Sequence, residues 1–373
     1  MVIRTKPHEL RDDMDLKLRV ANGTHTAVAH VMALSSLSST VSLSSDNNIL
    51  MLYLDELVST QILPAFVSSR SNNSIQKNCG GGGENGNDII KAIASTTKIV
   101  RDVYDDWRKR LTHPSFGLDV FFIAQNGAAK GGIRLGPTIK NLILSSSSMM
   151  MMSSSSSLFE EGEDSTNISV GFVAAFAFIL RYLTPSSPSS LSSYPAITDG
   201  RFIRRGWLDG FRRNGTGDNN QHNNNKNDEN DGATMYADGM CYHLKQGWYE
   251  FRCDCLINVN GGRSVFLPDA LANLFASSSS LSSPQPSECV EVIRSYLIAD
   301  GGGGLSSLLA IGAGSSCNSS GERILMILSR AISTLYARLV AGDRTMELLR
   351  EMHDRQGVYR DGGFGTDCVR LFD

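Results

Sequence analysis

Residues 168–183, ISVGFVAAFAFILRYL, are apolar almost all round if they form a helix. A helix with no polar face is stable only when it is buried on every side. The apolar run within it, residues 168–180, is also too short to cross a bilayer and is followed by Arg181. We therefore expect residues 168–183 to be the central helix of a mainly α-helical domain.

Helical periodicity predicts a shell of further helices around this segment. Their expected ranges are 13–34, 49–66, 88–111, 115–130, 137–144, 266–276, 288–298, a short apolar helix after Gly301–Gly304, and 321–352 as one helix or a pair. In the helix 88–111, the side chains expected to face inward are Ile90, Ile93, Ile99, Val103 and Trp107. Residues 248–267 instead alternate as strands, and the Asn-Gly-Gly at 260–262 predicts one β-hairpin. The fold class is thus about ten helices with a small hairpin.

Low-complexity segments interrupt this domain. They cover residues 35–48, 67–87, 145–167 and 184–235 and are rich in Ser, Asn, Gly or Met. We expect each to be a flexible, solvated insert that the fold does not need. The helical domain then spans 1–353, and 354–373 form a loose polar tail.

The composition limits the function classes. A net charge of −3 gives no basic surface for nucleic acid or an anionic membrane, and 41% hydrophobic residues suffice for a sizeable core. The charged N-terminus lacks the apolar run of a secretory signal. The 7 cysteines are odd in number and irregular in spacing, which fits a reducing compartment. These features predict a cytoplasmic location and neither membrane nor nucleic-acid partners.

A polar triplet lies near the N-terminus, in KLRVANGTH. Lys17, Asn22 and His25 stand at about 0°, 140° and 80° around a straight helix, so they could line one wall of a cleft. A desolvated Lys can act as a general base, an Asn amide can donate to a developing oxyanion, and a His can hold a hydroxyl or carbonyl. This chemistry suits the interconversion of an alcohol and a ketone. The alternative is an ordinary amphipathic helix with an exposed Lys, a capping Asn and a structural His.

Three other patterns are weaker. Residues 81–86, GGGENG, match a dinucleotide fingerprint in form, but no strand precedes them, which favours a linker. Residues 201–214, RFIRRGWLDGFRRN, could bind anions or nucleic acid, but their low-complexity surroundings favour a disordered insertion. Two further pairs, Cys241-x-His243 and Cys253-x-Cys255, lack the C-x2-C spacing that is usual in zinc sites, so we predict no metal site.

The stretch KLRVANGTH resembles the catalytic signature of the mannitol dehydrogenase family of long-chain polyol and hexuronate dehydrogenases. A second block, IAQNGAAK-x3-R-x2-P at residues 123–137, is similar to a later block of that family. Its form is nearest the tagaturonate reductase (altronate oxidoreductase) branch. The likeness covers residues 8–144, and a weaker one runs through 168–183, 255–276 and the C-terminal helices.

The resemblance implies roles for six residues. In the first block, Lys17 would be the general base, Asn22 would stabilise the oxyanion and His25 would hold substrate. In the second, the substrate-binding residues would be Asn126, Lys130 and Arg134. The resemblance also implies a multi-helical C-terminal domain with the 6-phosphogluconate-dehydrogenase-like fold, NAD as cofactor, and a sugar alcohol or hexuronate as substrate.

In that family a Rossmann domain binds NAD, and no strand, Gly-rich turn and helix precede Lys17 here. We expect a Rossmann domain in cis or in trans to supply the NAD site, and this chain alone to fold without NAD-dependent activity. The pair Gly131-Gly132 departs from the family pattern and is expected to loosen the turn between Lys130 and Arg134. The alternative function is a helical binding or assembly domain that has lost catalysis.

Overall fold

The computed structural model describes the chain in several stretches. They are residues 7–35, 37, 39–44, 49–69, 86–113, 115, 117–118, 120–124, 126–152, 168–185, 201–205, 242–243, 248–259, 262–276, 284–310 and 320–360. Within them the chain is mainly helical, as the sequence predicted. The predicted inserts 67–87, 145–167 and 184–235 and the tail 354–373 fall mostly outside these stretches, whereas much of 35–48 is described.

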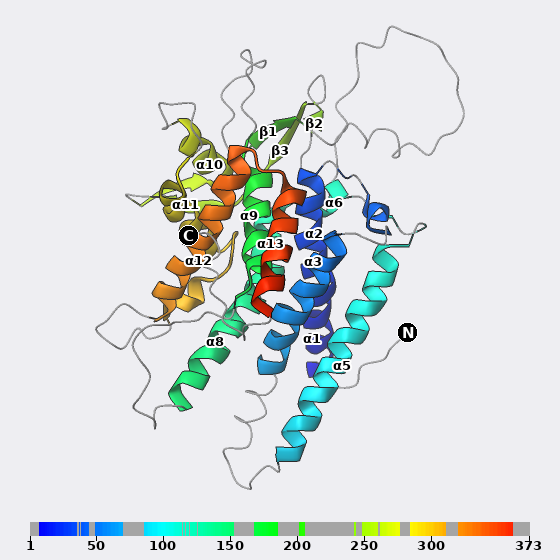
Figure 1. Ribbon diagram of the computed structural model, residues 1–373. Coiled ribbons are helices and arrows are strands. Elements are labelled where there is room, and N and C mark those ends of the chain that lie inside the picture. Colours follow the sequence, from blue (N-terminus) through cyan, green and yellow to red (C-terminus); the bar gives the residue numbers. More distant parts are fainter. Residues whose placement is uncertain are drawn as a thin grey trace, which may run out of the picture.

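The helix α9 (Val170–Leu183) runs through the middle of the protein, between α2 (Asn22–Leu34) and α12 (Ser320–Ala341) (Figure 1). Every residue of α9 except Arg181 is buried. Its N-terminus is capped by the Ser169 hydroxyl, which accepts a hydrogen bond of 3.3 Å from the Phe172 amide. The prediction of a central buried helix is confirmed.

The first long helix begins earlier than predicted and contains a π turn. It comprises α1 (Pro7–Leu16), the π turn η1 (Lys17–Ala21) and α2 without a break. The next helix has the same construction, with α3 (Ile49–Leu57) followed by the π turn η3 (Val58–Ile62) and a last stretch to Ser69. In each π turn an amide donates to the carbonyl five residues back, as Asn22 does to Lys17.

The helix α5 (Gly86–Leu111) corrects one prediction. Val103 and Trp107 do pack on the core, but Ile90, Ile93 and Ile99 are 65%, 37% and 37% exposed. The buried line instead runs through three other side chains, Thr96, Val100 and Tyr104. Ile99 lies one position before Val100, so it is about 100° off that line. Around Ile90 and Ile93 almost all of α5 is exposed.

The helix expected at 115–130 is broken in two. α6 (Val120–Ala124) and α7 (Gly127–Lys130) are separated at Asn126, whose φ of 54° is left-handed. We had predicted that a helix carries Asn126. Asn126 instead lies in the turn between α6 and α7, so that prediction was wrong. After Lys130 the chain continues without a break through the π turn η5 (Gly131–Leu135) into α8 (Gly136–Met152). α8 thus extends eight residues into the predicted insert 145–167.

Two small antiparallel sheets follow. β4 (Leu256–Val259) and β5 (Arg263–Phe266) form the predicted hairpin, with Gly262 at φ 77° in its turn. A second sheet has the order β1-β3-β2, formed by β1 (Arg201–Arg205), β2 (Tyr242–His243) and β3 (Trp248–Arg252). β1 falls inside the segment 184–235, so the prediction of a wholly disordered insert there was wrong.

The C-terminal third is helical as predicted. It contains α10 (Leu267–Ala276), α11 (Pro286–Ile298), α12 and α13 (Thr345–Arg360), so 321–352 is a helix pair. Gly301–Gly304 are followed by a single 3₁₀ turn, η7 (Ser306–Ala310), and not by an α-helix. The last helix also runs several residues into the predicted tail.

The segment 35–48 is not simply solvated. It forms the 3₁₀ turn η2 (Thr40–Ser44), in which Thr40 and Leu43 are buried. Thr40 and Leu118 exchange two hydrogen bonds: the Thr40 amide donates to the Leu118 carbonyl, and the Leu118 amide donates to the Thr40 hydroxyl. The low-complexity prediction failed here because two residues in the tract make specific core contacts.

Two helices among the described residues are long and apolar enough to cross a membrane, Ile49–Ser69 and Gly321–Ala341. More than half of each apolar window, 61% and 56%, is buried inside the protein. Core helices meet the same length and composition criteria.

Candidate functional site

The π turn η1 changes how Lys17, Asn22 and His25 are arranged. A π turn takes up one extra residue, so the steps from Lys17 to Asn22 and to His25 advance like about four and seven α-helical residues. On that count the three lie at about 0°, 40° and −20°, a spread of about 60° and not the 140° of a straight helix. The π turn therefore brings the triplet onto one face.

His25 lies half-buried on this face. Its Nε2 atom is buried and has no hydrogen-bond partner among the described residues. The ring meets Trp107 edge-on, with 5.7 Å between centroids. Burial, and then the positive charges of Arg134 and Lys130, lower the pKa of His25 to about 4. The ring is therefore neutral at pH 7, and its Nε2 is a buried nitrogen without a partner among the described residues.

The second block supplies two cations beside His25. The Lys130 Nζ donates to the Ile123 carbonyl at 2.8 Å, and the Arg134 Nη1 donates to the Thr26 hydroxyl at 2.9 Å. Both side chains are half-buried, and neither forms an ion pair within the described part of the chain. Burial, and then the charge of Arg134, lower the pKa of Lys130 to about 8.

Thr26 joins the two blocks. It is fully buried, and its hydroxyl donates to the Asn22 carbonyl at 2.8 Å while accepting from Arg134. Its own carbonyl lies 2.7 Å from the Nδ1 of His30, a fully buried ring whose pKa is lowered to about 4, chiefly by burial. Sequence reasoning missed both residues, because the contacts that set them apart, Thr26 with Arg134 and the His30 ring edge-on to Tyr182, cross between helices.

Arg19 is a third residue that the sequence did not single out. Only 2% of it is exposed, and its guanidinium lies 4.0 Å from the centre of the Phe66 ring. It donates to Thr138 at 3.3 Å and to Asp15 at 3.2 Å, and with the Asn141 amide turned it also donates to that side chain. Arg19 therefore ties the π turn η1 to α8.

The glycines after Lys130 do not loosen their turn, which corrects our prediction. A Cβ on Gly132 would lie 1.9 Å from the Gly302 carbonyl oxygen, and one on Gly136 would lie 2.6 Å from that of Gly303. The run Gly301–Gly304 thus packs directly against the turn that carries Lys130 and Arg134. This role as a backbone contact surface explains a glycine run that lacks the other residues of a phosphate loop.

The predicted site residues are therefore only partly gathered. His25, Lys130 and Arg134 lie around Thr26, and Asn22 joins them through its carbonyl. Asn126 is exposed at the turn between α6 and α7. Lys17 is exposed as well, and no hydrogen bond or ion pair within the described stretches joins its amine to His25 or Lys130. A catalytic base needs desolvation, so the role of Lys17 stays a prediction that requires a covering surface.

The described residues do not fit NAD by themselves. Their strands are all antiparallel, and none leads through a glycine-rich turn into a helix N-terminus. They also hold no cluster of three potential metal ligands. The thiols of Cys253, Cys255 and Cys289 are buried, which raises the pKa of each to about 12 and disfavours a thiolate ligand.

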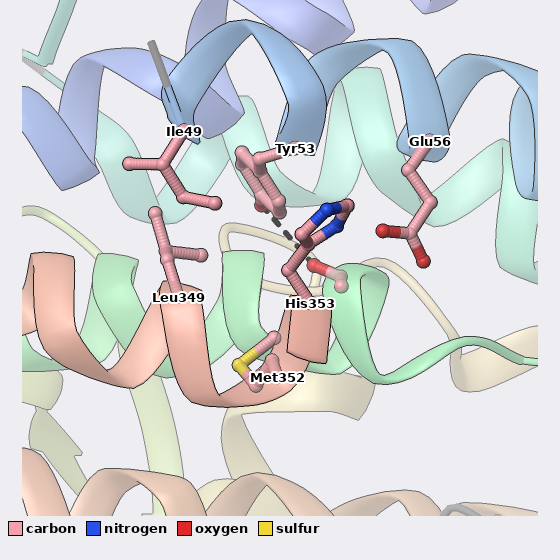
Figure 2. A pocket seen from close by; sticks show the side chains of 7 residues that line it. Ile49, Tyr53, Glu56, Leu349, Met352 and His353 are labelled. Atoms are coloured by element: carbon pink, nitrogen blue, oxygen red, sulfur yellow. Dashed lines mark hydrogen bonds between the residues drawn. The ribbon is translucent and has the colours of Figure 1, made fainter. Parts of the chain in front are cut away.

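Two cavities lie away from these residues. One, between α3, α9 and α13, has a volume of 10 Å³, about that of one water, and His353 and Glu56 both point toward it (Figure 2). The other is an open groove of 510 Å³ between the end of α12 and the start of α13. Two of its charges, Arg344 and Glu347, pair with each other. Neither cavity contains a predicted site residue.

Comparisons of the chain with protein-family models, with curated proteins and with solved structures find no match. The likeness to mannitol dehydrogenases therefore depends on the two sequence blocks alone. The structure adds the spatial relation between those blocks.

Proposed function

We propose that this chain is the substrate domain of an NAD-dependent oxidoreductase that interconverts a secondary alcohol and a ketone of a polyol or hexuronate. The observation that carries the proposal is the hydrogen-bonded link from Asn22 through Thr26 to Arg134. It brings together two sequence blocks more than 100 residues apart, each of which resembles a block of one enzyme family. Their meeting is what a shared active site requires.

The roles follow from the chemistry of each side chain. Lys130 and Arg134 are cations without a carboxylate partner in the described residues, so they can bind the oxygens of a sugar acid or polyol. The neutral His25 can hold a hydroxyl at its free Nε2, and the Asn22 amide can donate to an oxygen that gains negative charge. Lys17 would remove the hydroxyl proton once a partner surface covers it.

NAD supplies the hydride acceptor in such enzymes. Because the described residues do not fit NAD, we assign no step of hydride transfer to them. In this proposal a Rossmann domain, in cis or in trans, binds NAD and also desolvates Lys17. The structural support for the covering surface is an exposed line formed by Leu10 and Met14 on α1 and by Lys17, the first residue of η1. Leu10 and Met14 are 58% and 53% exposed.

Trp107 provides a direct test of substrate binding, because it touches His25. Altronate, tagaturonate, mannitol and fructose are titrated into the chain while tryptophan fluorescence is followed. We expect a saturable change with at least one of them, absent in Trp107→Phe and weakened at least tenfold in Arg134→Met. A chain that gives no saturable change with any of the four would refute substrate binding at this site.

A second experiment tests catalysis. The chain is assayed for NAD-dependent oxidation of altronate and mannitol, alone and joined to a Rossmann domain of this enzyme class. We expect activity only in the joined protein and its loss in Lys17→Ala. If saturable binding occurs but the joined protein is inactive, the alternative of a non-catalytic binding domain is favoured.

A further inference from the structure

We propose that Lys130 is a nucleophilic amine that forms an imine with aldehydes or ketones carrying an anionic group, which Arg134 holds. This activity differs from the dehydrogenase chemistry above, where Lys130 only contacts substrate, and does not depend on it. The site could then bind oxo acids and phosphorylated carbonyl compounds covalently, through an imine with Lys130.

The geometry around Lys130 separates it from ordinary surface lysines. Its amine is half-buried and tethered to the Ile123 carbonyl at 2.8 Å, and no carboxylate in the described stretches neutralises it. The neighbouring charge is another cation, Arg134, four residues further along the same helix. A desolvated lysine beside a second cation is an established way to obtain a nucleophilic amine.

These surroundings make a larger fraction of the amine neutral. With a pKa of about 8, about 9% of Lys130 is unprotonated at pH 7, against about 0.04% of an ordinary lysine. The lower basicity also weakens each neutral amine as a nucleophile; with the Brønsted slope near 0.45 that holds for thiols applied to the amine, the loss is about tenfold. The net expectation is that Lys130 reacts about 20-fold faster than an ordinary lysine at pH 7.

The reaction is balanced without an oxidant or reductant. The amine nitrogen attacks the carbonyl carbon, and the carbonyl oxygen takes up a proton to give a carbinolamine. Loss of the hydroxyl as water, with the second N–H proton, forms the C=N bond. The products are one imine and one water, and the reaction is reversible until the imine is reduced.

Pyridoxal 5′-phosphate is a suitable probe, because it has an aldehyde and a phosphate. The chain is treated with it, trapped with borohydride and digested, and the labelled lysines are identified by mass spectrometry. Lys130→Arg removes the target. Lys140→Arg is the matched control, since Lys140 is a half-buried lysine on the adjoining helix α8. Peptide mapping also distinguishes labelling of Lys130 from labelling of the N-terminal α-amino group, which is similarly reactive because its ordinary pKa is near 8.

We expect Lys130 to be labelled about 20-fold faster than the other mapped lysines at pH 7, with a rate that levels off above pH 8. Lys140→Arg should leave that rate unchanged. Arg134→Met should remove the preference for pyridoxal phosphate over pyridoxal. Labelling of Lys130 no faster than that of the exposed Lys98 or Lys109 would overturn the proposal. Because no sugar or NAD is present, this result is independent of the test of the proposed function.

Discussion

Replacing Gly132 by Ala should destabilise the protein although Ala is the better helix former. The added Cβ would lie 1.9 Å from the Gly302 carbonyl oxygen and 3.0 Å from its carbon. Ordinary contacts begin at 3.4 Å, so η5 and the glycine run must separate by about 1.5 Å, the difference between 3.4 and 1.9 Å. Both partners are backbone, so neither can rotate away.

The magnitude follows from two opposing effects. Ala is favoured over Gly in a helix by about 1 kcal/mol. Overpacking a well-packed site costs about 1–3 kcal/mol, and a backbone clash lies at the upper end of that range. We therefore expect the free energy of unfolding to fall by about 2 kcal/mol.

Gly171→Ala is the matched control. Gly171 is also helical and buried, but its added Cβ would lie 3.5 Å from the nearest atom, in the Tyr53 ring, an ordinary contact. This variant should be as stable as the wild type or more stable, by up to about 1 kcal/mol.

Urea denaturation followed by circular dichroism at 222 nm measures both variants. We expect the midpoint of Gly132→Ala to fall and that of Gly171→Ala to hold or rise, with unchanged slopes. If Gly132→Ala were as stable as Gly171→Ala, the contact between η5 and the glycine run would not exist as described.

Three further predictions concern the hydrogen-bonded residues and the histidines. Thr26→Val should lower the free energy of unfolding by about 1–3 kcal/mol in urea denaturation, because it removes the buried hydroxyl that accepts from Arg134 and donates to the Asn22 carbonyl. Thr26→Ser keeps that hydroxyl and should retain most of the stability. Arg19→Met should lower the free energy of unfolding by about 2–4 kcal/mol in the same assay, because Thr138 loses a buried hydrogen-bond partner. Arg11 is exposed, so Arg11→Met is the control and should change that free energy by less than about 0.5 kcal/mol. Equal effects of the two substitutions would refute the role of Arg19. In the folded protein the pKa values of His25 and His30 are lowered to about 4, so on acidification the unfolded chain binds a proton at each ring before the folded protein does. The free energy of unfolding should therefore fall as the pH drops from about 6.5 to 4, by on the order of 3 kcal/mol for each ring. His30→Gln should remove about half of that loss, and an unchanged pH profile would show that His30 is not buried neutral.

The sequence predicted those features that depend on local pattern. α9 could be placed at the centre because its own residues exclude a polar face, and the β4–β5 hairpin because Gly262 is in its turn. The exposure of Ile90 and Ile93 could not be predicted, because it depends on how far the neighbouring helices reach along α5. The sequence of a helix does not show whether a neighbouring helix covers a given apolar residue.

The candidate site was predictable as a set of residues, but not as an arrangement. Arg134 reaches Thr26 across 108 positions and Arg19 reaches Thr138 across 119, and no spacing rule links residues so far apart. The π turn η1 is equally invisible, since one extra residue in a turn leaves the composition unchanged. The left-handed Asn126 was hidden by a helical pattern on both of its sides.

The π turns make the chain's helices adjustable by single residues. Each of the three, η1, η3 and η5, holds one residue more than an α-helical turn of the same height. Deleting one residue from η1 would leave an unbroken α-helix in which Asn22 and His25 follow Lys17 by four and seven positions, so α1 and α2 would keep their relative orientation. Lys17 would then still share one face of the helix with Asn22 and His25. The π turns are thus places where such a scaffold could gain or lose a single residue without losing its fold or the arrangement of the residues on either side.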